Sequence, residues 1–275
     1  MGDIRQTAIG IAREAGALLL PYYRRRVKVE YKGEVDIVTE ADRASERLIL
    51  DKLRDYFPDH AVMAEESGGH AGHSVYRWYI DPLDGTTNFA HSFPMFCVSM
   101  GLERDGEMIL GVIFDPLREE LFSAEKGSGA KLNDQRIHVS SVSHLEESLV
   151  ATGFPSNKRH KSINIHFYHQ ISMRSHGVRR AGSAALDLAY VAAGRLDCFW
   201  EFNLNPWDMA AGRLIIQEAG GCVTDMKGQP HLLNSASIAA SNRLLHPQLI
   251  EAFQEIFSGI YRVMLPEIGA TDNRE

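Results

Sequence analysis

The stretch WYIDPLDGTTN, residues 78–88, decides how the rest of the chain is interpreted. An apolar run ends on Asp81, and a second aspartate, Asp84, follows three positions later. Pro82 restricts the backbone between the two aspartates, and Leu83 is apolar, so the two carboxylates are held at a preset spacing. Two negative charges this close repel each other unless a positive charge lies between them. The stretch therefore predicts a buried strand that ends in a cation site.

The residues that directly follow the aspartates favour binding of a phosphate group. Gly85, Thr86, Thr87 and Asn88 offer free backbone N–H groups and hydroxyls, which phosphate recognition at a turn or a helix start requires. Carboxylate and carbonyl oxygens suit Mg²⁺, which binds few carboxylates and keeps waters and phosphate oxygens. Two such ions can activate a water and stabilise a leaving alkoxide in one in-line displacement.

The composition is that of a globular protein with an acidic balance. The chain has 275 residues, 44% of them hydrophobic, and a formal net charge of −7, which suits one large domain or two closely packed halves. Nucleic-acid and membrane binders need a basic face, so the acidic balance disfavours direct contact with either. The acidic balance does not exclude a phosphorylated small substrate, because a metal ion can supply the local positive charge.

Membrane and disulfide-rich classes are also disfavoured. No window approaches the roughly 18 apolar residues of a membrane-spanning helix. Three cysteines, Cys97, Cys198 and Cys222, lie in apolar contexts and form no CxxC pair, so we expect them to be buried and reduced. We therefore expect a cytoplasmic protein.

Hydrophobic periodicity predicts the local structure of the first half. Apolar residues at helical spacing predict a first helix that ends near Pro21. Alternation around Lys32 and Gly33 predicts a hairpin, and Asp105-Gly106 predicts another between two longer strands. We expect this half to be antiparallel.

The second half alternates strands and helices. We expect a single catalytic domain over residues 1–275, with a strand-rich half at 1–145, an alternating half at 146–265 and a loose tail at 266–275. The active site is expected where the two halves meet.

Further acidic residues lie at expected strand or helix ends. Asp36, Glu65, Glu66 and Asp208 are the members of this group. Each alone has an ordinary explanation, such as a turn, a solvated strand end or a helix first turn. Like Asp81 and Asp84, they are acidic residues at the ends of expected elements, and together this favours one shared metal site.

Three motifs in this order resemble the inositol monophosphatase family: AEES (64–67), DPLDGTTNF (81–89) and PWDMAAG (206–212). Three longer segments are similar to the family as well: VDIVTEAD (35–42), KGSGAKLNDQRIHVS (126–140) and RAGSAALDLAYVAAGRLDCFWE (180–201). The resemblance covers nearly the whole chain. It implies a layered α-β-α-β-α sandwich, intermediate between the α+β and α/β classes, and a homodimer. It also implies a Mg²⁺-dependent, typically lithium-sensitive phosphatase of the superfamily that includes fructose-1,6-bisphosphatase.

The resemblance assigns metal ligands residue by residue. It implies two or three Mg²⁺ ions, the first held by Glu65, Asp81 and the backbone carbonyl of Leu83. The second is held by Asp81, Asp84 and Asp208, so Asp81 would bridge the two ions.

The resemblance also assigns the catalytic residues and the substrate pocket. It implies that Thr86, hydrogen-bonded to Asp36, orients the attacking water and that Glu66 supports the site. Backbone N–H groups of Gly85 and Thr86 would hold the phosphate. The groups implied to meet the substrate hydroxyls are those of Asp84, Gly182, Ser183, Ala184 and Glu201. Arg179 and Arg180 lie beside this segment. A contact of at least one of them with the substrate or another subunit, and a role as exposed charges at a strand end, are equally open.

We expect hydrolysis of inositol 1-phosphate or a similar polyol phosphate. Histidinol phosphate, fructose 1,6-bisphosphate and 3′-phosphoadenosine 5′-phosphate stay open as substrates, because their phosphatases share the metal core. EFNLNPWD (201–208) departs at Asn203 and Asn205 from the pattern EIGLRPWD of bacterial family members, and Asn205 replaces a basic residue. Some bacterial members act as binding proteins on RNA metabolism or transcription complexes, so a regulatory protein partner is the non-enzymatic alternative.

Overall fold

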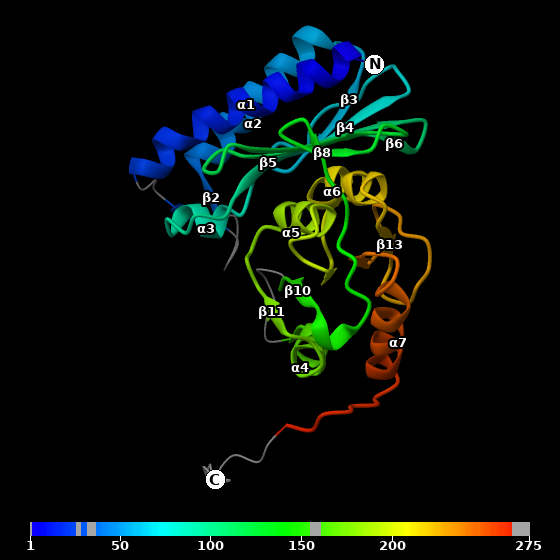
Figure 1. The fold of residues 1–275 in the computed structure, drawn as a ribbon. Coiled ribbons are helices and arrows are strands. Elements are labelled where there is room, and N and C mark those ends of the chain that lie inside the picture. Colours follow the sequence, from blue (N-terminus) through cyan, green and yellow to red (C-terminus); the bar gives the residue numbers. More distant parts are fainter. Residues whose placement is uncertain (1, 26–28, 32–36, 155–160, 266–275) are drawn as a thin grey trace.

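The protein is a stack of five layers in which helices and sheets alternate, as Figure 1 shows. The computed structural model describes residues 2–25, 29–31, 37–154 and 161–265. Helices α1 and α2 cover the outer face of the larger sheet, α5 and α6 lie between the two sheets, and α4 and α7 cover the smaller sheet. The predicted α-β-α-β-α sandwich is confirmed.

The elements have the following bounds. The helices are α1 Gly2–Arg25, α2 Glu40–Tyr56, α3 Thr86–Ala90, α4 Asn164–Ser172, α5 Ala184–Ala192, α6 Pro206–Glu218 and α7 His246–Phe257, with a 3-10 turn at Leu145–Glu147. The strands are β1 Val29–Tyr31, β2 Ile37–Thr39, β3 Ala61–Ala64, β4 Tyr76–Asp84, β5 Cys97–Arg104, β6 Glu107–Asp115, β7 Glu120–Glu125, β8 Ala130–Leu132, β9 Gln135–Arg136, β10 Leu149–Thr152, β11 Gly177–Arg179, β12 Cys198–Phe202, β13 Cys222–Thr224 and β14 Ser237–Ser241.

The larger sheet has strand order β3-β4-β5-β6-β7-β8-β9. The β5–β6 hairpin turns at Asp105 (φ 50°) and Gly106 (φ 82°), a left-handed pair that matches the twist of the flanking strands. The expectation of an antiparallel first half is wrong at one edge, where β3 pairs with β4 in parallel. The connection over residues 65–75 carries the chain back to the other end of the sheet before β4 begins. Strands β1 and β2 pair antiparallel, while Lys32 and Gly33, the predicted turn, lie outside the described residues.

Helix α1 continues past Pro21 to Arg25, so the predicted end of this helix is wrong. A proline inside a helix removes one backbone hydrogen bond and costs about 3 kcal/mol. The residues after it offset this cost by packing: the Tyr23 ring lies 5.0 Å from that of Phe96 and 5.5 Å from that of Phe89. Core packing therefore keeps the last turn of α1 helical.

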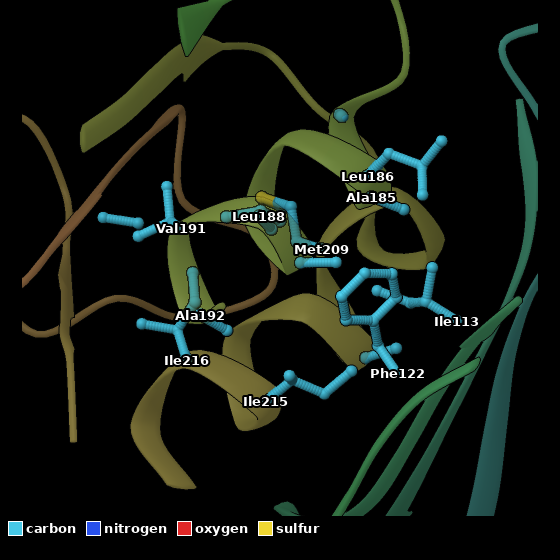
Figure 2. Packing of buried hydrophobic residues seen from close by; sticks show 14 of the residues in the cluster. Ile113, Phe122, Ala185, Leu186, Leu188, Val191, Ala192, Met209, Ile215 and Ile216 are labelled. Atoms are coloured by element: carbon cyan, nitrogen blue, oxygen red, sulfur yellow. The ribbon is translucent and has the colours of Figure 1, made fainter. Parts of the chain in front are cut away.

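Small residues let the middle layer approach the larger sheet. A Cβ on Gly101 would lie 2.7 Å from the Ala210 side chain, and one on Gly111 would lie 2.6 Å from the Ala211 carbonyl oxygen. These contacts hold α6 directly against β5 and β6. Figure 2 shows this core, in which Phe122 from β7 and Met209 from α6 face each other among aliphatic side chains.

The smaller sheet has strand order β11-β10-β12-β14-β13. Strand β10 pairs in parallel with β11 and β12, and β14 pairs antiparallel with β12 and β13. Parallel strands place their carboxyl ends at one edge, so β10 and β12 both end beside the start of α6. In the described part of the chain no helix is both long and apolar enough to span a bilayer, and residues 266–275, the predicted tail, lie outside that part.

Candidate active site

A cavity of about 930 Å³ opens where strand ends and helix starts from both halves of the chain meet. It is lined by the end of β4 and the start of α3 from the first half. The ends of β10 and β12 and the starts of α5 and α6 line it from the second half. Of the predicted site residues it contains Glu65, Asp81, Leu83, Asp84, Gly85, Thr86, Arg180, Gly182, Ser183, Ala184, Glu201 and Asp208.

A β-bulge at the end of β4 positions the two central aspartates. Asp81 pairs with Ser99 and Asp84 with Cys97, so β4 has one more residue than β5 in this interval. Pro82 lies in the bulge, where a strand tolerates a residue without a backbone donor. The Leu83 N–H donates to Asp81 Oδ1 at 3.0 Å. The bulge re-aims both carboxylates into the cavity.

The start of α5 holds Asp84 from the opposite side. Asp84 Oδ2 accepts hydrogen bonds from the Ser183 hydroxyl and from the Ala185 N–H, both at 2.7 Å. Ser183 is also the residue that caps α5. The carboxylate is thereby fixed in one rotamer, which a metal ligand requires.

Glu65 and Asp208 reach the cavity from β3 and α6. The turn after β3 is held by Glu46 of α2, which is buried and accepts the N–H groups of Glu66 at 2.8 Å and Ser67 at 2.9 Å. Asp208 lies in the first turn of α6, where its Oδ2 accepts the Asn205 N–H at 2.7 Å. Glu66, predicted as a supporting residue, is not among the residues that line the cavity.

The carboxylates raise one another's pKa. Burial, followed by the charges of Glu65, Asp84 and Asp208, raises the pKa of Asp81 well above its usual range. Burial raises the pKa of Asp84 and of Asp208 as well, and for Asp208 the charge of Asp84 adds to the effect. A cation between these groups would relieve the repulsion and keep them ionised.

The donor set fits Mg²⁺. Among the six carboxylates of the lining, the four predicted as ligands are those of Glu65, Asp81, Asp84 and Asp208; together with the Leu83 carbonyl they are hard oxygen ligands. Across the described ranges, no three His, Cys, Asp or Glu side chains close around a point tightly enough to form a cage by themselves. Mg²⁺ needs no such cage, because it is held by one or two carboxylates together with waters and substrate phosphate oxygens.

Thr86 has a carboxylate partner, and in the described residues it is Asp42. The Thr86 hydroxyl lies 2.9 Å from Asp42 Oδ1 and 3.0 Å from the Leu83 carbonyl oxygen. The other oxygen of Asp42 accepts the Thr39 N–H at 2.8 Å and the Thr39 hydroxyl at 2.6 Å. Asp36, the predicted partner, lies outside the described residues.

The backbone turn after Asp84 requires glycine. Gly85 has φ 97°, in the left-handed region, and a Cβ there would lie 2.7 Å from the Met95 carbonyl oxygen. Helix α3 starts directly after it, so the N–H groups of its first turn have no intrahelical acceptor. These groups border the cavity beside Asp84, as the predicted phosphate contact requires.

Glu201 forms the far wall of the cavity. Burial raises its pKa to about 8, with added repulsion from Asp187 and Asp84 and a smaller opposing effect from Arg180. A Cβ on Gly153 would overlap the Glu201 carboxylate, so glycine at the end of β10 makes room for it. Arg179 and Arg180 are both exposed, and of the two only Arg180 lines the cavity.

Three residues of the site region were not singled out from the sequence: Asp42, Glu46 and Asp187. Asn88, expected in the phosphate-binding turn, has a further role. Asn88 donates to the carbonyl oxygens of Ala181 at 2.8 Å and Gly182 at 3.2 Å, which ties the turn before α5 to α3. The signal for Asp42 is in the sequence, because Thr39 and Asp42 have the spacing of a capping box. The contacts of Glu46 and Asn88 with distant backbone have no local signal.

The fold and the carboxylate-lined cavity define a member of the inositol monophosphatase family, and the chain belongs to it: the family model matches residues 1–258. Over 262 residues the chain is 44% identical to the Nus factor SuhB of Pseudomonas aeruginosa, covering 92% of this chain and 97% of that protein. It is 43% identical over 236 residues to the inositol-1-monophosphatase of Mesorhizobium japonicum, covering 85% of this chain and 89% of that protein.

A solved structure agrees with these relatives. The extragenic suppressor protein suhB from Bartonella henselae superposes with a TM-score of 0.88 at 42% identity. The match covers 92% of this chain and 99% of that one. The resemblance drawn from the motifs is confirmed.

Proposed function

We propose that this protein is a Mg²⁺-dependent phosphomonoesterase that releases phosphate from inositol 1-phosphate or a similar polyol phosphate. The observation behind the proposal is that Glu65, Asp81, Asp84 and Asp208, far apart in sequence, line one cavity beside the Gly85–Thr86 turn. Membership of the inositol monophosphatase family supports a phosphatase. A relative that bears the name inositol-1-monophosphatase supports the choice of substrate.

The carboxylates would hold the metal. Glu65, Asp81 and the Leu83 carbonyl form one candidate ligand set, and Asp81, Asp84 and Asp208 form the other. When bound, Mg²⁺ supplies charge neutralisation and Lewis acidity for phosphate ester hydrolysis. The bulge in β4 and the start of α5 keep the carboxylates in place before substrate arrives, so little reorganisation is needed during the reaction.

Thr86 and Asp42 would orient the attacking water. When the Thr86 hydroxyl donates its proton to Asp42 Oδ1, its oxygen keeps lone pairs that accept a hydrogen bond from water. Asp42 is held in turn by Thr39, so the Thr86 rotamer is restrained. This arrangement aims the water without a covalent enzyme intermediate.

The two ends of the cavity would bind different parts of the substrate. N–H groups at Gly85 and Thr86 would take the phosphate oxygens, as the start of a helix does. Glu201, across the cavity, would accept hydrogen bonds from polyol hydroxyls. Arg180, beside it, lowers the cost of burying this carboxylate.

Phosphate release from a panel of esters tests the proposal. With Mg²⁺, inositol 1-phosphate should be preferred over histidinol phosphate, fructose 1,6-bisphosphate and 3′-phosphoadenosine 5′-phosphate. Asp81→Asn should lower Mg²⁺-dependent turnover by at least about 100-fold, because it removes the carboxylate expected to bridge both ions. Asp51→Asn, on the exposed face of α2, is the matched control and should retain full activity. Unimpaired turnover by Asp81→Asn contradicts the metal site, and preference for histidinol phosphate contradicts the substrate.

A regulatory binding role is the second candidate. It is favoured by the relative named Nus factor SuhB, which matches almost the full length of this chain. Complementation of a deletion strain with the Asp81→Asn variant separates the two functions. If the inactive variant complements, binding to a protein partner is the required function; if it does not, catalysis is required. The homodimer and the lithium sensitivity implied by the resemblance stay predictions, as does the cytoplasmic location expected from the cysteines and the apolar pattern.

A further inference from the structure

We propose that Asp187 is a second carboxyl receptor for substrate hydroxyls, which acts beside Glu201 and selects polyol phosphates over phosphate esters without a hydroxylated ring. The inference deepens the proposed function and rests on it. It gives a specificity role to a residue that the motifs did not single out.

Asp187 is buried and faces the cavity. It lies in the first turn of α5, which also holds Asp84 through Ser183. The residue is 2% exposed and forms part of the cavity lining together with Glu201 and Arg180. Its Oδ1 atom has no hydrogen-bond partner among the described residues.

Other buried aspartates in the described residues show what a structural role looks like. Asp197 Oδ2 accepts the Leu149 N–H at 2.7 Å. Asp115 Oδ1 accepts the N–H groups of Leu117 at 2.9 Å and Arg118 at 3.1 Å. These carboxylates fix loops through backbone donors. Asp187 has no such bond at Oδ1, although it is buried to a similar degree.

The charges around Asp187 make its burial unfavourable in the free protein. Burial and then the charge of Asp84 raise its pKa well above the usual range, and Arg180 opposes them. Asp187 also acts on Glu201, whose pKa it raises. A buried carboxyl without full hydrogen bonding destabilises a fold, and such a group is retained where a ligand completes its bonding.

A neutral donor suits the part of the cavity beside these two carboxyls. Asp187 and Glu201 both line the cavity, and they are near enough for the charge of Asp187 to act on Glu201. Hydroxyl groups can donate to both without adding negative charge, as a polyol ring does with adjacent hydroxyls. A phosphate ester of a simple phenol offers no such donors.

Kinetics on two substrates test the inference. The enzyme is assayed with Mg²⁺ on inositol 1-phosphate and on 4-nitrophenyl phosphate. Asp187→Ala should raise KM for inositol 1-phosphate at least about tenfold and change kcat/KM for 4-nitrophenyl phosphate less than about twofold. Asp187→Asn, which keeps the size and one acceptor, should lie between the wild type and Asp187→Ala.

Thermal unfolding without substrate separates binding from structure. Asp187→Ala and Asp187→Asn should unfold at the wild-type temperature or above it, because they remove an incompletely bonded buried carboxyl. Asp197→Ala is the matched control and should lower Tm by about 2–6 °C, because it leaves the Leu149 N–H without its partner.

Three outcomes overturn the inference: equal losses on both substrates, an unchanged KM for inositol 1-phosphate, or a drop in Tm for the Asp187 variants like that of Asp197→Ala. If the wild type releases no phosphate from any polyol phosphate, the proposed function and this inference both fail. If the wild type is active and the Asp187 variants match it on both substrates, only this inference fails.

Discussion

At the scale of single residues, the Thr86 hydroxyl is held between two acceptors. It has one proton and two acceptors in reach, Asp42 Oδ1 at 2.9 Å and the Leu83 carbonyl oxygen at 3.0 Å. If Leu83 contributes its carbonyl to a metal, the proton is directed to Asp42. The hydroxyl then presents its lone pairs to water in one orientation.

Replacing Asp42 by Asn should therefore lower kcat by about 100-fold, within the range expected when a proton acceptor is lost, with little change in KM. Thr39→Ala is the comparison variant: it removes the Thr39 hydroxyl from the capping box but keeps the Thr39 N–H that donates to Asp42, so it should cost about 1 kcal/mol of stability and lower kcat far less than Asp42→Asn. Steady-state kinetics and thermal unfolding of both variants give the measurement. Equal losses of kcat in the two variants would show that Asp42 acts only through the fold of α2.

At the scale of elements, α1 shows how one helix meets two environments. Gly10 has no atom within 4 Å of the place where a Cβ would be added. Gly16 faces the core, where a Cβ would lie 2.6 Å from the Phe114 ring and 3.1 Å from Pro116. The same residue type thus has an ordinary helical position at one site and a close approach to the larger sheet at the other.

Gly10→Ala should raise the free energy of unfolding by about 0.5–1 kcal/mol, since alanine reduces the entropy of the unfolded chain and fits the helix. Gly16→Ala should instead lower it by about 1–3 kcal/mol, because the added methyl group overpacks the contact with Phe114. Urea unfolding of the two variants measures the difference. A stabilised Gly16→Ala protein would show that α1 and the larger sheet are packed less closely than described.

At the scale of the whole molecule, two buried histidines make stability depend on pH. Burial lowers the pKa of His246 to about 4, and its ring nitrogens contact the hydroxyls of Thr224 at 2.9 Å and Ser241 at 2.7 Å. Burial and then the charge of Arg213 lower the pKa of His231 to about 4 as well. Both residues lie in the half of the chain built on the smaller sheet.

The contribution of these two histidines to the free energy of unfolding should fall as the pH drops from about 6.5 to 4. In this window the unfolded chain binds protons on both histidines, whose ordinary pKa is about 6.5, while the folded protein does not. The contribution is fully present above about pH 6.5. The difference in stability between wild type and His246→Gln, measured by urea unfolding, should therefore shrink as the pH falls. A stability difference for His246→Gln that stays constant with pH contradicts the prediction.

Local patterns along the chain account for much of the site. The strand that ends on Asp81, the proline step and the glycine turn at Gly85 are consequences of neighbouring residues, because backbone preferences and like-charge repulsion act over a few positions. The family motifs predicted every carboxylate of the cavity lining except Asp187. The sequence by itself therefore determined the family, the layered fold and the carboxylates proposed as metal ligands.

Only the tertiary structure decided which residues support those carboxylates. Three features depend on segments distant in sequence. They are the contact of Asp42 with Thr86, the hydrogen bonds of Glu46 to the turn after β3 and the burial of Asp187. Such contacts depend on how α2 and α5 pack against the strand ends, and no spacing along the chain encodes that distance. The end of α1 was misjudged for the same physical reason, since core packing of Tyr23 outweighs the local cost of Pro21.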